Sequence, residues 1–190
     1  RACLLSRGLG DVYKRQVFIP LTLIVVLLIK GESSDLVVLL SLLGISSLGF
    51  LIYNWPPASI FMGDSGSLFL GYLFGTLIIK TTMTGEVSIW SWIIVFAYFI
   101  SDTVVTQILR IILVKKWWHP HRSHAYQNLA RITESHLKVT GGVTIYNLFW
   151  IFPLTIWSSL VPELSLIAVL LAVIPAIVVA CKYGPIFSSS

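Results

Sequence analysis

The chain has 190 residues, of which 56% are hydrophobic and 11% are charged, and its mean hydropathy is +0.89. Ordinary soluble domains are about 45–50% apolar and about 25% charged, so this composition excludes such a domain and predicts an integral membrane protein. The two cysteines, Cys3 and Cys181, lie at opposite ends of the chain, which excludes a disulfide framework and a C-x-x-C metal or redox pair.

The first 16 residues, RACLLSRGLGDVYKRQ, contain neither the apolar length of a membrane span nor a helical stripe. They resemble read-through from a sequencing adaptor or a tag. We therefore expect residues 1–16 to form a non-native or disordered tail, and the native chain to start well upstream. Residues 183–190 are expected to form a second tail.

Six apolar runs follow one another between these tails. They comprise residues 17–29, 36–53, 60–79, 88–114, 143–160 and 164–181. Since spanning helices need about 20 apolar residues, we predict an all-α polytopic transmembrane bundle of about six segments, a fragment of a larger multi-span fold. The first run is short for a span, and the fourth is longer than one and is interrupted by Ser101 and Asp102.

Small residues and prolines add detail to these runs. Ser67, Gly71 and Gly75 are spaced at four, and such a stripe lets a neighbouring helix approach closely. Pro153 and Pro175 lie inside the last two runs and predict kinks.

The distribution of Lys and Arg predicts the orientation, because cytoplasmic loops carry an excess of both. If the first run enters from the cytoplasm, the external loops hold two basic residues, Lys30 and Lys80, whereas the cytoplasmic side holds seven outside the expected tail. Asp64, Asp102 and the histidines of the loop at residues 115–140 all come out on the cytoplasmic face, as a single active site at the membrane surface requires.

Asp64 is the first candidate functional residue. It lies in NWPPASIFMGDSGSLFLG, a stretch that begins at Asn54 and separates two apolar runs. A carboxylate at the mouth of a spanning segment is costly and therefore indicates function. The alternative is that Asp64 only caps the helix that follows.

Glycine and serine residues surround this carboxylate. Gly63 and Gly66 flank it and allow a ligand to come close to the backbone. Ser65, Gly66 and Ser67 are expected to open a helix, whose first N–H groups would form an anion site. Together with a carboxylate that can hold a divalent cation, the stretch suits a metal-bound phosphate or pyrophosphate.

Asp102 lies in the sequence SDTVVTQILR, with Thr106 and Arg110 on the same helical face. It is either a helix-end charge satisfied by hydroxyl groups or another helix, or a residue that orients a catalytic group or the substrate. The residues alone leave both interpretations open.

The loop KKWWHPHRSHAYQNLARITESHLKVT is the one long polar segment between the runs, and its net positive charge favours an anionic partner. Its histidines suggest zinc, but Pro120 breaks their spacing and no cysteine or clear acidic ligand accompanies them. His121, Arg122 and His124 instead offer donors for phosphate oxygens or for a leaving group. The alternative is a solvated basic loop.

The stretches IFMGDSGSLFLG, SDTVVTQILR and HPHRSHAYQNLAR, in that order, resemble the polyprenyl-phosphate N-acetylhexosamine-1-phosphate transferases (glycosyltransferase family 4), over about residues 17–181. This family includes the phospho-MurNAc-pentapeptide transferase and the enzymes that initiate O-antigen. The resemblance implies a multi-span helical enzyme of the bacterial inner membrane with a cytoplasmic active site. It implies transfer of a sugar-1-phosphate from a UDP-N-acetylhexosamine to undecaprenyl phosphate, with Mg²⁺ and release of UMP.

By motif, Asp64 corresponds to the family's magnesium-binding aspartate, and His124, preceded by Arg122, to a histidine of its His-rich loop. We expect these three residues to be catalytic. Further expected substrate contacts are Asn54, Gly63, Ser65, Gly66, Ser67, His121 and Asp102. The resemblance makes residues 17–182 the transferase domain, with the lipid bilayer as partner and no nucleic acid; a homodimer stays open.

The chain also departs from the family pattern. Tyr126 and Gln127 stand where other members have histidine, which resembles the O-antigen and capsule branch. The family's acidic pair lies upstream of the region present here, and the chain contains no Asp-Asp, so we expect this fragment to be inactive by itself.

Two other classes of protein are alternatives to the enzyme. A metal-ion transporter using Asp64, Asp102 and the histidines would line a path with polar residues near the middle of several spans, whereas here they gather at one face. A scaffold without a ligand leaves the glycine–aspartate motif unexplained.

Overall fold

The computed structural model describes residues 10–32, 34–54, 59–60, 62–113 and 124–184. These residues form helices without a strand, which confirms the prediction of an all-α, polytopic helical fold. The chain divides into two compact units, Arg1–Trp92 and Ile93–Ser190, each of which is described by itself.

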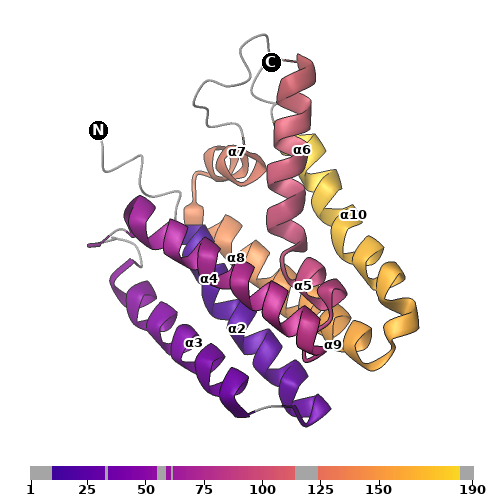
Figure 1. Cartoon of the computed structure of the whole chain (residues 1–190). Coiled ribbons are helices and arrows are strands. Elements are labelled where there is room, and N and C mark those ends of the chain that lie inside the picture. Colours follow the sequence, from indigo (N-terminus) through magenta and orange to yellow (C-terminus); the bar gives the residue numbers. More distant parts are fainter. Residues whose placement is uncertain (1–9, 33, 55–58, 61, 114–123, 185–190) are drawn as a thin grey trace. The chain divides into compact units, whose positions relative to one another are not determined.

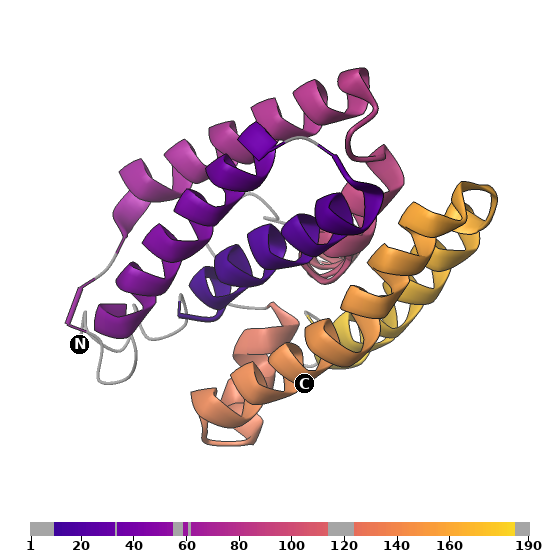
Figure 2. The same ribbon diagram turned by 90° about the horizontal axis from the view of Figure 1, so that it is seen from below.

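The first unit consists of helices α2 (Gly10–Lys30), α3 (Ser34–Asn54), α4 (Gly63–Thr84) and the start of α5 (Ile89–Val95). Helices α2 and α3 lie side by side (Figures 1 and 2). Leu23, Leu27 and Leu40 are fully buried. Because this core is built from the apolar sides of adjacent helices, it follows directly from the hydropathy of the chain.

Helix α2 begins seven residues before the boundary predicted at residue 17. Residues 10–16 are therefore helical rather than disordered, and residues 1–9 lie outside the described part. Extending a helix backwards fixes one residue per added hydrogen bond, which costs far less than starting a new helix.

At the end of the first unit that is remote from Asp64, hydrogen bonds connect the helices and the turn after α4. The Lys30 ammonium donates to the backbone oxygens of Gly85 and Glu86, at 3.3 and 2.9 Å. Trp92, which is almost fully buried, donates from its indole N–H to the Thr81 hydroxyl at 2.9 Å. Lys30 and Glu86 thus share one end of the unit, as the alternation of loops predicted.

Among the described residues of this unit, nothing packs closely on the two glycines of the small-residue stripe of α4. A Cβ added at Gly71 or Gly75 would meet no atom within 4 Å. The expectation of a closely approaching neighbour is therefore not met here. The buried residues of α4 are Leu70, Phe74, Leu77 and Thr81. Bulky side chains remove more apolar area from water than glycines do, so they determine the packed face.

The second unit contains the end of α5 and the remaining helices. These are α6 (Ala97–Leu113), α7 (Ala125–Ile132), α8 (His136–Tyr146), η1 (Asn147–Ile151), α9 (Phe152–Leu160), η2 (Pro162–Leu164) and α10 (Ser165–Tyr183). Helix α10 packs mainly along α6 (Figure 1). Alanines at every fourth position of α10, Ala168, Ala172, Ala176 and Ala180, are all buried, and such small residues allow close packing of helices.

The prolines act differently in the two helices. Before Pro153 the chain forms a π-helical turn, η1, in which the Phe152 N–H bonds to the Asn147 oxygen five residues back. Proline lacks an N–H and its ring displaces the preceding turn, which accounts for the π-helical turn; the kink predicted at Pro153 stays a prediction. Helix α10 continues without interruption through Pro175.

Four helical segments are long and apolar enough to span a membrane: Asp35–Asn54, Gly63–Thr84, Leu137–Leu160 and Pro162–Tyr183. Helices α5 and α6 form a fifth if their pair, bent by 71°, counts as one span. The described part of the chain therefore contains four or five candidate spans rather than six, because the apolar helix Val17–Lys30 is shorter than a span. The bend falls at Phe96, whereas Ser101 and Asp102 lie within the continuous helix α6.

Candidate functional site

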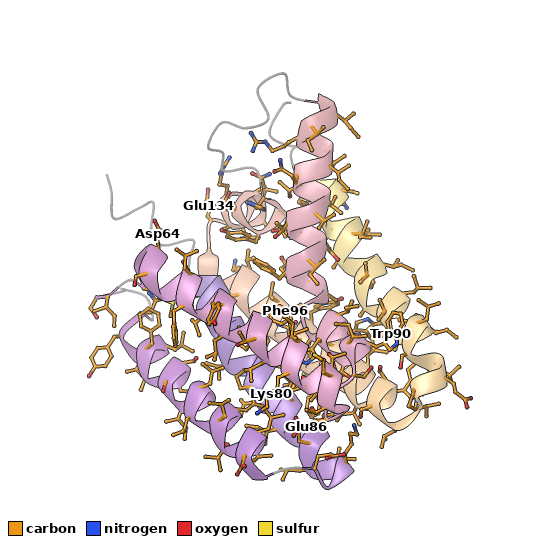
Figure 3. The ribbon with its side chains drawn as sticks, in the orientation of Figure 1. Asp64, Lys80, Glu86, Trp90, Phe96 and Glu134 are labelled. Carbon is orange, nitrogen blue, oxygen red and sulfur yellow. The ribbon has the colours of Figure 1, made fainter. Side chains whose placement is uncertain are left out.

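Asp64 lies in the first turn of α4 and is exposed. Figure 3 shows it at one end of this helix, with Lys80 and Glu86 towards the other end. The N-cap position belongs to Met62, and no side chain bonds to the helix start there. The interpretation of Asp64 as a mere N-cap is therefore wrong, although its charge still interacts favourably with the helix dipole.

Glycine is favoured at two positions near Asp64 for different structural reasons. Gly63 has a φ of 65°, in the left-handed region that disfavours other residues. Gly66 has an ordinary helical backbone, but a Cβ there would collide with the Met62 side chain. A side chain at position 66 would thus require the Met62 side chain to move, whereas Gly63 is favoured by the turn that leads into the helix.

The serines confirm the predicted helix start. Ser65 and Ser67 are exposed in the first turns of α4, and the Ser67 hydroxyl donates to the backbone oxygen of Asp64 at 3.0 Å. Within the described residues, no hydrogen bond or ion pair involves the Asp64 carboxylate. This carboxylate is therefore available to an external ligand.

Asn54 occupies the last position of α3 and is 3% exposed. Its side-chain amide donates to the Ile60 oxygen at 2.8 Å, which ties the end of α3 to the segment that leads into α4. The structure thus gives Asn54 a loop-closing bond, and its role as a substrate contact stays a prediction.

In the second unit, Asp102 and His124 come together. Asp102 Oδ2 lies 3.3 Å from His124 Nδ1, and Asp102 Oδ1 accepts the Ala125 N–H at 3.1 Å. Asp102 is 6% exposed, while the His124 side chain is 26% exposed. Of the two interpretations left open for Asp102, the structure shows features of both: the carboxylate caps another helix, and it contacts the candidate catalytic histidine.

The local sequence explains why His124 lies at this point. His124 has extended backbone angles and is the N-cap residue of α7, and its oxygen accepts from the N–H groups of Gln127 and Asn128. The first N–H group of the helix, that of Ala125, has no acceptor within α7, and the carboxylate of Asp102 in α6 accepts its hydrogen bond. The ring of Tyr126 stacks on His124 with centroids 6.0 Å apart.

Asn128 is a residue of this site that the sequence did not single out. Its side-chain amide donates to the backbone oxygens of Tyr183 and Gly184, at 2.7 and 3.1 Å, and so attaches α7 to the end of α10. Its side chain is almost fully buried. An Asn on the apolar face of a short amphipathic helix was the signal that could have identified it.

Asp102, Thr106 and Arg110 are all buried, which confirms that they share one face of α6. His121 and Arg122 lie outside the described residues. The described part of the chain contains no group of three or more His, Cys, Asp or Glu that could hold a metal ion. A single exposed carboxylate such as Asp64 still fits Mg²⁺, which binds through one or two carboxylates and takes other ligands from phosphates and water. Asp64 and the Asp102–His124 pair belong to different units.

The comparisons with known proteins agree on one family. Residues 12–82 match the model of glycosyl transferase family 4. A probable undecaprenyl-phosphate N-acetylglucosaminyl 1-phosphate transferase of Bacillus subtilis is 37% identical over 154 residues, which are 75% of this chain and 42% of the relative.

Two phospho-N-acetylmuramoyl-pentapeptide-transferases are also similar. That of Kosmotoga olearia is 56% identical over 59 residues, 31% of this chain and 18% of the relative. That of Streptococcus mutans is 30% identical over 133 residues, 70% of this chain and 37% of the relative. The chain spans less than half the length of these bacterial relatives, and no solved structure matches it.

Proposed function

This chain belongs, through residues 12–82, to glycosyl transferase family 4, and from that premise we propose that the whole protein transfers an N-acetylhexosamine-1-phosphate from a UDP-sugar to undecaprenyl phosphate and releases UMP. The names of the relatives support this class of transferase in a bacterial membrane. The donor, the leaving nucleotide and the cytoplasmic location of the site are parts of the proposal.

The observation that supports the proposal is the exposure and position of the Asp64 carboxylate. This carboxylate is exposed in the first turn of α4, makes no N-cap bond, and lies within the residues that match the family. Neighbouring N–H groups at a helix start attract phosphate oxygens. These features support the proposal that Asp64 holds a cation beside a pyrophosphate.

Magnesium, when bound, would neutralise charge on the pyrophosphate of the donor. Asp64 is the residue of this chain that we assign to it. The exposed hydroxyls of Ser65 and Ser67, together with the first N–H groups of α4, would contact phosphate oxygens. Arg122 and His121 remain proposed donors to the leaving nucleotide.

His124 is proposed to donate to a phosphate oxygen, and Asp102 to position it. With a proton on Nδ1, the contact with Asp102 Oδ2 would fix the direction of the imidazole ring. Because Asp102 also holds the N-terminus of α7, one buried carboxylate determines both the position of the helix and the direction of the ring.

We further assign the protein to the initiation of O-antigen or capsule polysaccharide rather than to peptidoglycan synthesis. The support is Tyr126 and Gln127, which replace histidines of the family's loop and bond to each other, with the Gln127 amide donating to the Tyr126 hydroxyl at 3.1 Å. The similarity to the Bacillus subtilis protein favours GlcNAc-1-phosphate as the transferred group.

The test is a chimera in which this chain replaces the matched segment of the Bacillus subtilis relative. In lipid with Mg²⁺, UDP-GlcNAc and undecaprenyl phosphate, we expect the chimera to release UMP and form the lipid-linked sugar. The 190-residue chain alone should not do so, since phosphoryl transfer needs several charged groups around one metal. A folded chimera that binds UDP-GlcNAc without any transfer would contradict the proposed function.

A further inference from the structure

The second unit contains a pocket that the proposed function does not use. It has a volume of about 330 Å³ and lies between α6, α7, α8 and α10. Its walls are apolar and include Tyr98, Val143, Pro175 and Val179, and Lys138 is the charged residue among those that line it. Ligand pockets commonly measure about 300–1,000 Å³, so this volume suits one hydrocarbon chain rather than a whole substrate.

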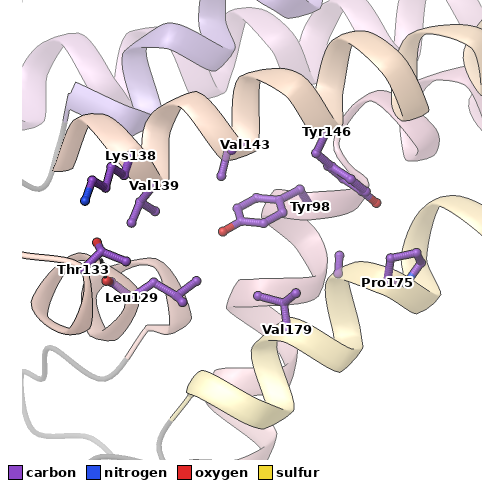
Figure 4. A pocket seen from close by; sticks show the side chains of 11 residues that line it. Tyr98, Leu129, Thr133, Lys138, Val139, Val143, Tyr146, Pro175 and Val179 are labelled. Atoms are coloured by element: carbon purple, nitrogen blue, oxygen red, sulfur yellow. Dashed lines mark hydrogen bonds between the residues drawn. The ribbon is translucent and has the colours of Figure 1, made fainter. Parts of the chain in front are cut away.

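The polarity of the pocket changes along its length. Figure 4 shows Lys138 and Thr133 at one end, Pro175 and Tyr146 at the other, and Val143 and Val179 between them. Lys138 is the second residue of the candidate span Leu137–Leu160, and Tyr146 lies about 12 Å deeper along α8. The pocket therefore has its charged end at the end of a span and its apolar end inside the span.

Two hydroxyl groups of residues that line the pocket have hydrogen-bond partners within the protein. The Tyr146 hydroxyl donates to the Ala172 oxygen, and the Thr133 hydroxyl donates to the Leu129 oxygen at 2.8 Å. The Lys138 ammonium, by contrast, makes no ion pair with any residue of the described ranges. A ligand would thus meet mainly apolar side chains in the depth of the pocket and an ammonium group at its end.

Positive charge around the Lys138 end of the pocket favours an anionic ligand there. The last turns of α7 and α10 contain Arg131 and Lys182, and Lys138 lies in the first turn of α8. Glu134 is the acidic residue between α7 and α8. Asn128 attaches α7 to the end of α10, so these basic residues belong to the same end of the unit.

We propose that this pocket binds one acyl chain of a membrane phospholipid whose anionic headgroup contacts Lys138. The order of the groups matches that of such a lipid, with the headgroup at the membrane surface and the chain in the hydrocarbon. Helices α8 and α10 both belong to candidate spans, so phospholipids surround the pocket walls. The site is separate from transfer and takes a structural lipid, not the acceptor.

The test exploits two adjacent glycines of α8. Gly142 lines the pocket, Gly141 does not, and a Cβ added to either would meet no atom within 4 Å. Gly142→Leu should therefore fill the pocket without a clash at Cβ, and Gly141→Leu is its matched control. The 190-residue chain is reconstituted with equal amounts of phosphatidylglycerol and phosphatidylcholine, and the lipids retained in mild detergent are counted by native mass spectrometry.

We expect the unchanged chain and Gly141→Leu to retain one phosphatidylglycerol. The amount of phosphatidylglycerol retained by Gly142→Leu should be lower by a factor of about ten or more, since each excluded methylene weakens binding about fourfold. Lys138→Gln should lower the preference for phosphatidylglycerol about fivefold, the effect of one cation near a membrane surface. Lys80→Gln, at the far end of α4, should not change it.

Equal retention by Gly142→Leu and Gly141→Leu would overturn the proposal. It would also be overturned if undecaprenyl phosphate displaced the retained phospholipid, because the pocket would then belong to the acceptor. If Gly142→Leu does not fold, Val179→Phe fills the pocket from the opposite wall, with the exposed neighbour Val178→Phe as control.

Discussion

Asp64 and Asp102 differ in what surrounds their carboxylates. Asp64 is exposed in the first turn of its own helix and makes no cap bond. Asp102 is buried, accepts the first N–H of another helix and contacts His124. Removing charge should therefore affect function at Asp64 and both function and local structure at Asp102.

We expect Asp64→Asn in the chimera to lose at least about a hundredfold in turnover, the scale seen when an electrostatic contact to a transition state is removed. The amide keeps the size of the side chain but not the charge that binds a cation. Since Asp64 is exposed, thermal unfolding should hardly change. Near-normal transfer by a folded Asp64→Asn chimera would show that the carboxylate does not hold the metal.

Asp102→Asn separates the two contacts of this residue. The amide oxygen can still accept the Ala125 N–H, but the charge opposite His124 is lost. We expect kcat to fall about tenfold or more with little change in KM, a part of what a proton-donating group contributes. Asp102→Ala should in addition destabilise the fold by about 1 kcal/mol through loss of the helix cap. If Asp102→Asn keeps full kcat and only Asp102→Ala is impaired, the residue is purely structural.

Arg122 and His124 can be distinguished from a merely basic loop by comparing single substitutions. If both contact the nucleotide sugar, Arg122→Ala and His124→Ala should each reduce transfer far more than Lys115→Ala or Lys182→Ala. Steady-state rates with UDP-GlcNAc measure this. Equal, small effects at all four positions would mean that only net charge matters.

At the scale of elements, the alanine stripe of α10 determines how the second unit packs. Ala172 is fully buried, and its backbone oxygen accepts from the Tyr146 hydroxyl of α8. Trp150 adds an indole N–H bond to the adjacent Leu171 oxygen at 3.0 Å. Close approach of helices is thus combined with hydrogen bonds to the α10 backbone.

We expect Ala172→Leu to destabilise the unit by about 1–3 kcal/mol, because added methylenes in a closely packed interface force neighbours apart. The control is Val178→Leu on the same helix, at a position that is 58% exposed. Unfolding in detergent, followed by circular dichroism, should separate the two variants. Equal stability would mean that α10 is not closely packed at Ala172.

At the scale of the whole molecule, the candidate spans and the distribution of basic residues predict an orientation. The loop at residues 115–140 should lie in the cytoplasm and Glu86 outside. In a background lacking Cys3 and Cys181, a reagent applied to intact cells should label Glu86→Cys but leave Ser123→Cys unmodified. Labelling of both positions at the same rate would contradict this topology.

Much of the architecture could be predicted from local patterns. Composition indicated a membrane protein, apolar runs indicated the long helices, and the spacing of Asp102, Thr106 and Arg110 indicated their common face. A helix opened by Ser65, Gly66 and Ser67 was also predicted, and α4 begins two residues before Ser65, at Gly63. These features depend on residues close together in the chain, where hydropathy and helical periodicity suffice.

Other features were decided by tertiary structure. The contact of Asp102 with His124, the attachment of Asn128 to the end of α10 and the pocket lined by Lys138 all join helices that are distant in sequence. The packed faces of α4 and α10 likewise depend on which neighbour offers more buried area: α4 buries Leu70, Phe74, Leu77 and Thr81 rather than its glycines, whereas α10 buries its alanines. A pattern within one helix shows which faces can pack, but the partner that packs there is determined by contacts between helices.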